Sequence, residues 1–438
     1  MKFALPYNCT CQRKEHKEMQ ENAQRLLAWV ERHQVRSVFL MCAACAVMLL
    51  FRRTDAFYFP QFYAEDGKLF FADAFNDGWA SLFNRANGYF HVYPRFLALL
   101  GLSVGISVFW IPTLFVIGTL LVYVLVWAYI YWRMPTSFFQ RCFAILATVY
   151  LPVGHEILMN LTNVQWLASL LIPLIVLGRP PLRKLGAALD VIILCFVCAT
   201  GPFALIWLPV LALWSYMKWS NSKFTWTNLI KLATVGLFAV IVAFSLVDHG
   251  SIERDGSNQG GSMFFGALQV LFNQLWYPII CIYVASVPFV LQLVLSAIAL
   301  VGLRWLFMQL RRIEDPFGLI LLIMSGVFFG VTLISYRHDL CSLSPIHVGM
   351  RNFYLPALFI VWAALSLPSK NVPKTMLFWC IVIGWMGFQT GAFLGRKQFE
   401  DLNWKYEAAQ IGNGSERVVP LNPPGWSMRL NAQPASDL

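Results

Sequence analysis

Apolar stretches of about 20 residues recur along this chain, and they constrain its fold more than any other feature. The chain has 438 residues, of which 58% are hydrophobic and 13% charged, whereas soluble proteins carry about 25% charged residues. At 1.5 Å per residue, about 20 helical residues cross ~30 Å of hydrocarbon. Because a backbone inside lipid must satisfy its own hydrogen bonds, these stretches predict helices. We therefore predict an all-α polytopic membrane protein.

We predict eleven spans and orient them by the charges of the loops between them. The predicted spans are 37–51, 108–132, 139–153, 166–178, 186–200, 203–217, 229–247, 277–303, 317–335, 354–368 and 375–394. Lys and Arg collect in the N-terminal segment and in alternate loops, which places these parts in the cytoplasm by the positive-inside rule. The opposite loops hold most of the acids, so they and the C-terminus are expected outside. Arg52 and Arg53, next to the first span, are exceptions to the rule.

Three parts of the chain follow from this map. Residues 1–36 are expected to form an amphipathic helix on the inner surface, and 37–394 a bundle that includes an outer loop at 52–107. Residues 395–438 are expected to form an outer tail. Within the first loop, 89–107 is interpreted as a helix on the outer surface, because a further span there would invert every later loop. The alternative is an ordinary span with a snorkelling Arg95.

Charge, cysteine and motif content exclude several classes of function. With its basic residues on the cytoplasmic side, the net charge of +11 implies contact with anionic lipid headgroups and no nucleic acid. Of the ten Cys, only Cys341 falls in a predicted outer loop, so no outer disulfide framework is expected. No P-loop, dinucleotide or H-E-x-x-H motif is present. We expect no cofactor; a divalent cation on the carboxylates has no motif to support it.

Polar residues gather in the outer loops, beginning with the acidic pair Glu65 and Asp66. The other members are His91, Arg95, His155, Glu156, Asn163, Gln165, Trp166, Arg337, His338 and Arg351. Moving a charge toward hydrocarbon costs several kcal/mol, so such a group of residues suggests a chemical role. A transporter would place its ionisable groups near the midplane, whereas the predicted spans are nearly free of charge, with Asp190 the main exception.

Each part of this group also has a simpler explanation. His155 and Glu156 could pair with each other at a helix end, and the acidic pair could lie in a solvated loop. Asn163, Gln165 and Trp166 could be a helix cap and an aromatic-belt residue, and Arg337 and His338 could be interfacial anchors. Their common position on one side of the membrane favours a shared site.

Five short motifs, in this order along the chain, carry a family resemblance. They are Y-A-E-D-G-x-x-F, T-N-x-Q-W, T-G-P-F, R-N-F-Y-L-P and the tail V-V-P-L-N-P-P-G-W-S-M-R-L. Together with a first outer loop bearing paired acids, they resemble the C-type glycosyltransferase superfamily (GT-C). Within it, the chain is similar to the bacterial inner-membrane enzymes that add glucose to the lipopolysaccharide O-antigen and change its serotype. The resemblance covers most of the chain in layout but only these motifs in residues.

The resemblance implies a hexosyltransferase of the bacterial inner membrane with its active site on the periplasmic side. Its donor would be a sugar on a polyprenyl phosphate, its acceptor an envelope glycan, and a flippase and a polyprenyl-phosphate sugar synthase would work beside it. Asp66, or else Glu65, would be the catalytic base. Arg351 would bind the donor phosphate, because a guanidinium offers phosphate a bidentate fork.

Further roles complete this expectation. Arg95 and Arg337 are the other candidates for the phosphate. Candidates for substrate binding are His91, His155, Glu156, Asn163, Gln165, Trp166 and His338. Aromatic residues of the tail, such as Trp404 and Trp426, suit stacking on an acceptor sugar, although the tail could equally be a capping segment. The two alternative functions are a lipid-linked oligosaccharide polymerase or ligase, and a glycolipid flippase or transporter without chemistry.

Overall fold

The structure is a computed structural model. It describes residues 32–153, 155–220, 225–248, 263–280, 287–337, 349–368, 372–391, 399–413 and 415–432, with isolated positions before residue 32 and between 338 and 348. Most of the predicted amphipathic segment at 1–36 lies outside the described residues, as does the predicted site residue His338.

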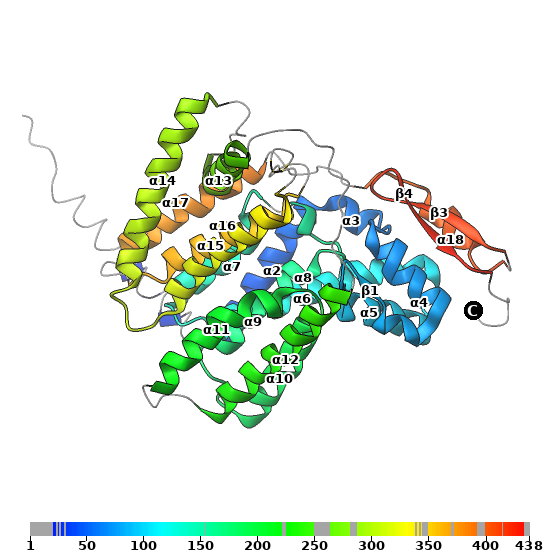
Figure 1. Ribbon diagram of the computed structural model, residues 1–438, viewed down its shortest axis with the longest axis horizontal. Helices are drawn as coiled ribbons and strands as arrows, with labels where there is room; N and C mark the ends of the chain where they lie inside the picture. The colour runs from blue at the N-terminus through cyan, green and yellow to red at the C-terminus, as the bar shows by residue number, and fades with distance from the viewer. Residues whose placement is uncertain are drawn as a thin grey trace, which may run out of the picture.

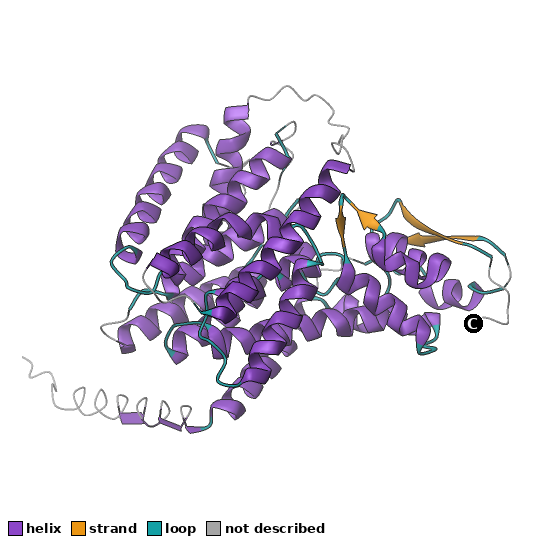
Figure 2. Cartoon of the chain, turned by 60° about the horizontal axis from the view of Figure 1, so that its bottom comes forward, coloured by secondary structure: helices purple, strands orange, loops and turns teal. Residues whose placement is uncertain are grey.

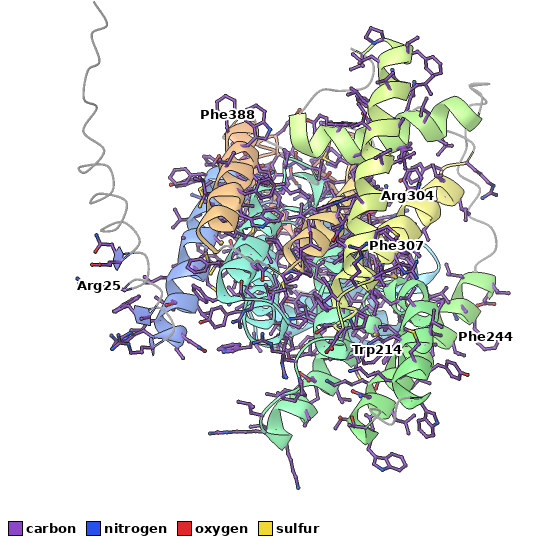
Figure 3. The ribbon with its side chains drawn as sticks, turned by 90° about the vertical axis from the view of Figure 1, so that its left-hand side faces the viewer. Arg25, Trp214, Phe244, Arg304, Phe307 and Phe388 are labelled. Atoms are coloured by element: carbon purple, nitrogen blue, oxygen red, sulfur yellow. The ribbon has the colours of Figure 1, made fainter. Side chains whose placement is uncertain are left out.

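Long apolar helices dominate the described chain, as the apolar stretches predicted. Five of them are long and apolar enough to cross a membrane. They are α2 (Gln34–Arg52), α6 (Ile111–Arg133) with the short η3 (Val108–Trp110) before it, α12 (Trp226–Asp248), α14 (Phe289–Leu310) and α15 (Phe317–Ser335). Large apolar side chains such as Phe244 of α12 and Phe388 point outward from the bundle (Figure 3). The chain is therefore a helical, multi-pass membrane protein.

Other helices occupy the remaining predicted spans. They are α7 (Phe138–Tyr150), α8 (Val164–Ala168), α9 (Leu171–Val176), α10 (Lys184–Cys198), α11 (Phe203–Ser220), α13 (Met263–Ile280), α16 (Arg351–Leu365) and α17 (Val372–Gly391). The single span predicted at 277–303 is wrong, because α13 and α14 are separate helices there. Pro288 is the N-cap of α14, in an extended conformation that a continuous helix could not contain. The count of eleven crossings stays a prediction.

The two arginines that break the positive-inside rule are buried inside the protein. The guanidinium of Arg53 is paired with Asp55 at 3.0 Å and donates to the carbonyl of Leu158. Arg52 donates to the carbonyls of Val149 and Leu151. Since both side chains bind protein groups and not the aqueous phase, their charges say nothing about which side of the membrane they face. They join the end of α2 to the end of α7 and the segment after it.

The charged exception among the predicted spans, Asp190, is also neutralised internally. Its carboxylate, fully buried on α10, accepts hydrogen bonds from Arg133 at 2.9 Å and from Lys231 at 3.0 Å. The hydroxyl of Tyr129 adds a third bond at 2.9 Å. These contacts of Asp190 join α6, α10 and α12, so the role of its carboxylate is structural.

Between α2 and α6 the chain forms a compact unit of short elements, called here the loop unit (residues 53–107). Its elements are α3 (Thr54–Tyr58), the π-helix η1 (Asp66–Phe71), α4 (Ala72–Asp77), η2 (Gly78–Phe83), β1 (Arg85–Ala86), β2 (Tyr89–Phe90) and α5 (Val92–Ser103). The β1–β2 hairpin turns through Asn87 and Gly88, both with positive φ, as an Asn-Gly hairpin turn requires. With 12 residues, α5 rises about 18 Å, too little to cross the hydrocarbon. This length agrees with the predicted surface helix.

The C-terminal tail folds onto the loop unit. It consists of α18 (Trp404–Gln410) and the antiparallel hairpin of β3 (Arg417–Leu421) and β4 (Trp426–Leu430). Figure 1 shows the tail beside α3, α4 and α5 at one end of the molecule, and both small sheets lie at this end in Figure 2. The side-chain amide of Asn76 holds the tail by bonds to Arg429 and Asn431 of 3.1 and 2.9 Å. The predicted outer loop and tail thus form one structural unit.

Candidate functional site

Asp66 lies at the start of the π-helix η1, where the backbone has been turned sharply. Ala64, two residues before it, has a φ of 44°, a left-handed conformation that is uncommon outside glycine. The backbone amide of Asp66 donates to the carbonyl of Tyr63 at 2.8 Å, closing the turn. Gly67 follows, and a Cβ there would lie 2.7 Å from Leu421 of the tail. The glycine of the Glu65-Asp66-Gly67 motif is therefore explained by the close approach of the tail.

The carboxylate of Asp66 is directed into the protein, at 3% exposure. It accepts a hydrogen bond of 2.7 Å from the hydroxyl of Thr162 and one of 3.3 Å from the backbone amide of Leu161. Burial raises the pKa of Asp66 to about 7, and the charge of Glu65 adds to the rise, although the bond from Thr162 opposes it. A carboxylate with a pKa near 7 can accept a proton at neutral pH, which a free carboxylate does poorly.

Glu65, its neighbour, is only half-buried, so the two acids of the pair occupy different environments. Its charge acts on the guanidinium of Arg351, which comes from the start of α16 nearly 300 residues later. Two carboxylates whose surroundings differ in this way are typical of sites that divide acid–base and electrostatic work between them.

Arg351 lies in a cluster of polar side chains. Its guanidinium is paired with the carboxylate of Glu156 at 2.8 Å and lies 3.5 Å from the side-chain oxygen of Asn163. Tyr89 and Tyr336 are close enough for their hydroxyls to interact electrostatically with it. The side chain of Arg351 keeps 29% of its surface exposed, so it is only partly covered by the protein.

The segment 155–163 connects Asp66 to Arg351. It contains η4 (His155–Ile157), and Met159 in it has a φ of 56°, a second left-handed residue near the site. The side-chain amide of Asn163 donates to the carbonyl of Glu156 at 3.1 Å, and its backbone amide donates to the side-chain oxygen of Asn160 at 3.0 Å. Such strained backbone persists where surrounding contacts hold it, and it occurs often at functional sites. Arg351 contacts Glu156 and Asn163 of this segment, and Asp66 contacts Leu161 and Thr162 next to Asn163.

The two carboxylate oxygens of Glu156 have different surroundings. Its Oε1 binds Arg351, whereas its Oε2 is buried without a hydrogen-bond partner among the described residues. The alternative in which Glu156 pairs with His155 stays a prediction, and in the structure the Oε1 of Glu156 is directed to Arg351. The side chain of His155 lies outside the described part of the chain.

His91 and Arg95, predicted as ligands of the substrate, are packed inside the loop unit. Arg95 has no exposed surface; its guanidinium is paired with Asp73 at 2.6 Å and stacks over the ring of Phe70. Burial, followed by the charge of Arg95, lowers the pKa of His91 to about 3, so the imidazole is neutral. These contacts favour a role in holding the loop unit together over a role in binding phosphate.

The remaining predicted residues divide between the site and its surroundings. Gln165, on α8, is buried, and its Oε1 has no partner among the described residues. Trp166 packs edge-on against Phe203 in the bundle. Arg337 is exposed just after the end of α15, and its guanidinium donates to the carbonyl of Ile334 at 3.3 Å. The structure does not bring Arg337 into contact with Arg351 or Asp66.

Two tail aromatics, considered for stacking on a sugar, are used for packing. Trp404 is buried against Phe62 and donates to the carbonyl of Phe109 at 3.0 Å. Trp426 lies under the ammonium of Lys68, 5.3 Å from its ring centre. These contacts agree with the alternative of a capping segment.

Several residues of the site were missed in the sequence. Thr162 was inside the T-N-x-Q-W motif but had no role of its own, although a hydroxyl beside a buried acid is a typical partner. Tyr89 and Tyr336 gave no signal, because aromatic residues are common throughout the chain. No group of three or more His, Cys, Asp or Glu residues suited to a metal ion occurs in the described part of the chain.

Comparison of the chain with protein-family models, with curated proteins and with solved structures gives no match.

Proposed function

We propose that this protein is an inner-membrane glycosyltransferase of GT-C type that moves a sugar from a polyprenyl phosphate to an envelope glycan at the periplasmic face. The observation that carries this proposal is the carboxylate of Asp66, buried beside Thr162 and joined through segment 155–163 to the partly exposed side chain of Arg351. A buried base and a phosphate-binding cation on one connected framework are the two groups that such a transfer needs.

Asp66 is proposed as the base. A sugar hydroxyl is a poor nucleophile at neutral pH, and its proton must leave as its oxygen bonds to the anomeric carbon. A positioned base contributes about 10²–10⁴-fold to such a step. The bonds from the hydroxyl of Thr162 and the backbone amide of Leu161 orient the carboxylate. Direct displacement assisted by one base inverts the anomeric centre.

Arg351 is proposed to bind the donor phosphate. The leaving group of the reaction is the polyprenyl phosphate, and stabilising its growing negative charge lowers the barrier. In the structure the fork of Arg351 is partly occupied by Glu156, which holds the guanidinium in place. A phosphate would bind the remaining N–H groups, and Glu65 beside it would repel an anion placed on the wrong side.

Membrane attachment supports a lipid-linked donor over a soluble one. The loop unit and tail together form only a small structure on the bundle, and no described segment forms a separate nucleotide-binding domain. The reaction would therefore take place where the loop unit meets the bundle, with the donor reaching the site from the outer leaflet.

The test is transfer of labelled sugar from a synthetic polyprenyl-phosphate donor by membranes that contain the protein. Asp66→Asn is expected to abolish transfer, and Arg351→Lys to lower it at least tenfold, because charge remains but the fork is lost. Arg351→Ala should be lower still. Asp77→Asn, an exposed acid on the same loop, is the control and should transfer normally. Normal transfer by Asp66→Asn would contradict the proposal.

A transporter is the competing function, and the same membranes distinguish it. A flippase would move the intact lipid-linked sugar between leaflets without forming a glycosidic bond. Movement of the donor without any product in the wild-type protein would favour that alternative.

A further inference from the structure

The turn that presents the acidic pair depends on a residue of the tail, more than 350 positions later in the chain. Ala64 adopts its left-handed conformation directly before Glu65. Its backbone amide donates to the carbonyl of Asn422 at 2.5 Å, and Tyr63 forms a parallel bridge with the same residue. An alanine in this conformation is disfavoured relative to glycine, so a contact must hold it there. Asn422 supplies that contact.

Asn422 is itself locked in place. It has no exposed surface, and its side-chain amide makes two hydrogen bonds to the backbone of Glu400, accepting at 2.7 Å and donating at 3.0 Å. Only an amide side chain offers an acceptor and a donor in this arrangement. Gln61 makes a matching pair of bonds to Glu400 and Leu402, of 3.0 and 2.9 Å. The two amides clamp the start of the tail to the start of the loop.

The next residue of the tail supports the other side of the acidic pair. Leu421 lies so close to Gly67 that a Cβ would be 2.7 Å from it. Residues 421 and 422 thus contact the chain immediately before and immediately after Glu65 and Asp66. Neither contact involves the carboxylates, so the tail acts on them only through the backbone.

We propose that Asn422 is a positioning residue, which holds the left-handed turn at Ala64 and so directs the carboxylate of Asp66 at Thr162. This inference rests on the proposed role of Asp66 as the base. It gives the tail a function in the transfer reaction other than contact with the acceptor sugar.

The first test is transfer by Asn422→Ala, which removes both bonds to Glu400. Transfer should fall at least tenfold. Asn422→Asp should be no better, because it places a carboxylate oxygen against the carbonyl of Glu400. The matched control is Asn413→Ala, an exposed asparagine of the same tail, whose transfer should be normal.

A second substitution distinguishes positioning from general support of the fold. Glycine adopts the left-handed conformation without strain, so Ala64→Gly should restore roughly tenfold of the activity lost in Asn422→Ala. A residue that merely stabilised the fold would show no such rescue. Failure of the rescue, with both proteins accumulating normally in the membrane, would overturn the inference.

A third measurement does not depend on activity. A spin label on Glu65→Cys, in a protein whose ten native cysteines are replaced by serine, should give a broad, immobilised spectrum that becomes mobile when Asn422→Ala is added. An unchanged spectrum would overturn the inference whatever the activities are. If the label becomes mobile and Ala64→Gly immobilises it again, but the unsubstituted protein transfers no sugar, the proposed function fails while the positioning of the turn stands.

Discussion

Asp66 should make the protein less stable at the pH at which it works. Its pKa in the folded protein is raised from 3.8 to about 7, mainly by burial. At about 1.4 kcal/mol per pH unit, this difference corresponds to about 4 kcal/mol. Because the pKa of Asp66 is higher in the folded protein than in the unfolded chain, the stabilisation of the folded protein by the protonated acid is fully present below pH 3.8. This stabilisation is lost as the pH rises to about 7, and above that pH the buried charge lowers the stability of the folded protein by the full difference of about 4 kcal/mol.

Replacing Asp66 with Asn removes this cost while keeping the size of the side chain. The amide oxygen can still accept the bond from Thr162, but the bond from Leu161 is lost, at a cost of about 1 kcal/mol. The net gain is about 3 kcal/mol at pH 8. In a chain of 438 residues it corresponds to a rise of about 3 °C in the melting temperature. Near pH 4 the gain should vanish.

The assay is thermal unfolding of the purified protein in lipid nanodiscs between pH 4 and pH 8, for the wild type and for Asp66→Asn. The transfer rate of the wild type should rise with pH through about 7, because the base must be deprotonated, while the variant shows no transfer at any pH. A melting difference that does not depend on pH would refute the argument, since it would mean that Asp66 is not buried as a titrating acid. A transfer rate already constant above pH 5 would likewise remove Asp66 as the base.

The remaining predictions concern the loop unit and the topology. Asp73→Asn should destabilise the protein by about 3 kcal/mol, measured as a lower melting temperature, because it leaves the buried guanidinium of Arg95 without its partner; equal melting of Asp73→Asn and the exposed Asp77→Asn would contradict this. Alkaline phosphatase fused after residue 395 should be active, and after Lys184 inactive, if the tail is periplasmic. The reverse pattern would overturn the orientation.

Much of the site's composition could be read from the sequence, because burying charge near lipid is costly and leaves few unexplained polar residues. Asp66, Glu156, Asn163 and Arg351 were all singled out, and the structure places them on one connected framework. Their partners could not be read. Nothing in the local sequence indicates that Arg95 forms an ion pair with Asp73, or that Arg351 forms one with Glu156.

The sequence by itself determined that the chain is a helical membrane protein, because hydrocarbon imposes the same length and backbone rules on every apolar stretch. Only the tertiary structure decided where the charges go. It buried Arg53 against Asp55, separated α13 from α14, and brought Asn422 of the tail beneath Ala64. The reason is physical: hydropathy acts on each segment alone, whereas an ion pair or a backbone clamp joins residues far apart in the chain. Such contacts exist only once the bundle and its loop unit have packed together.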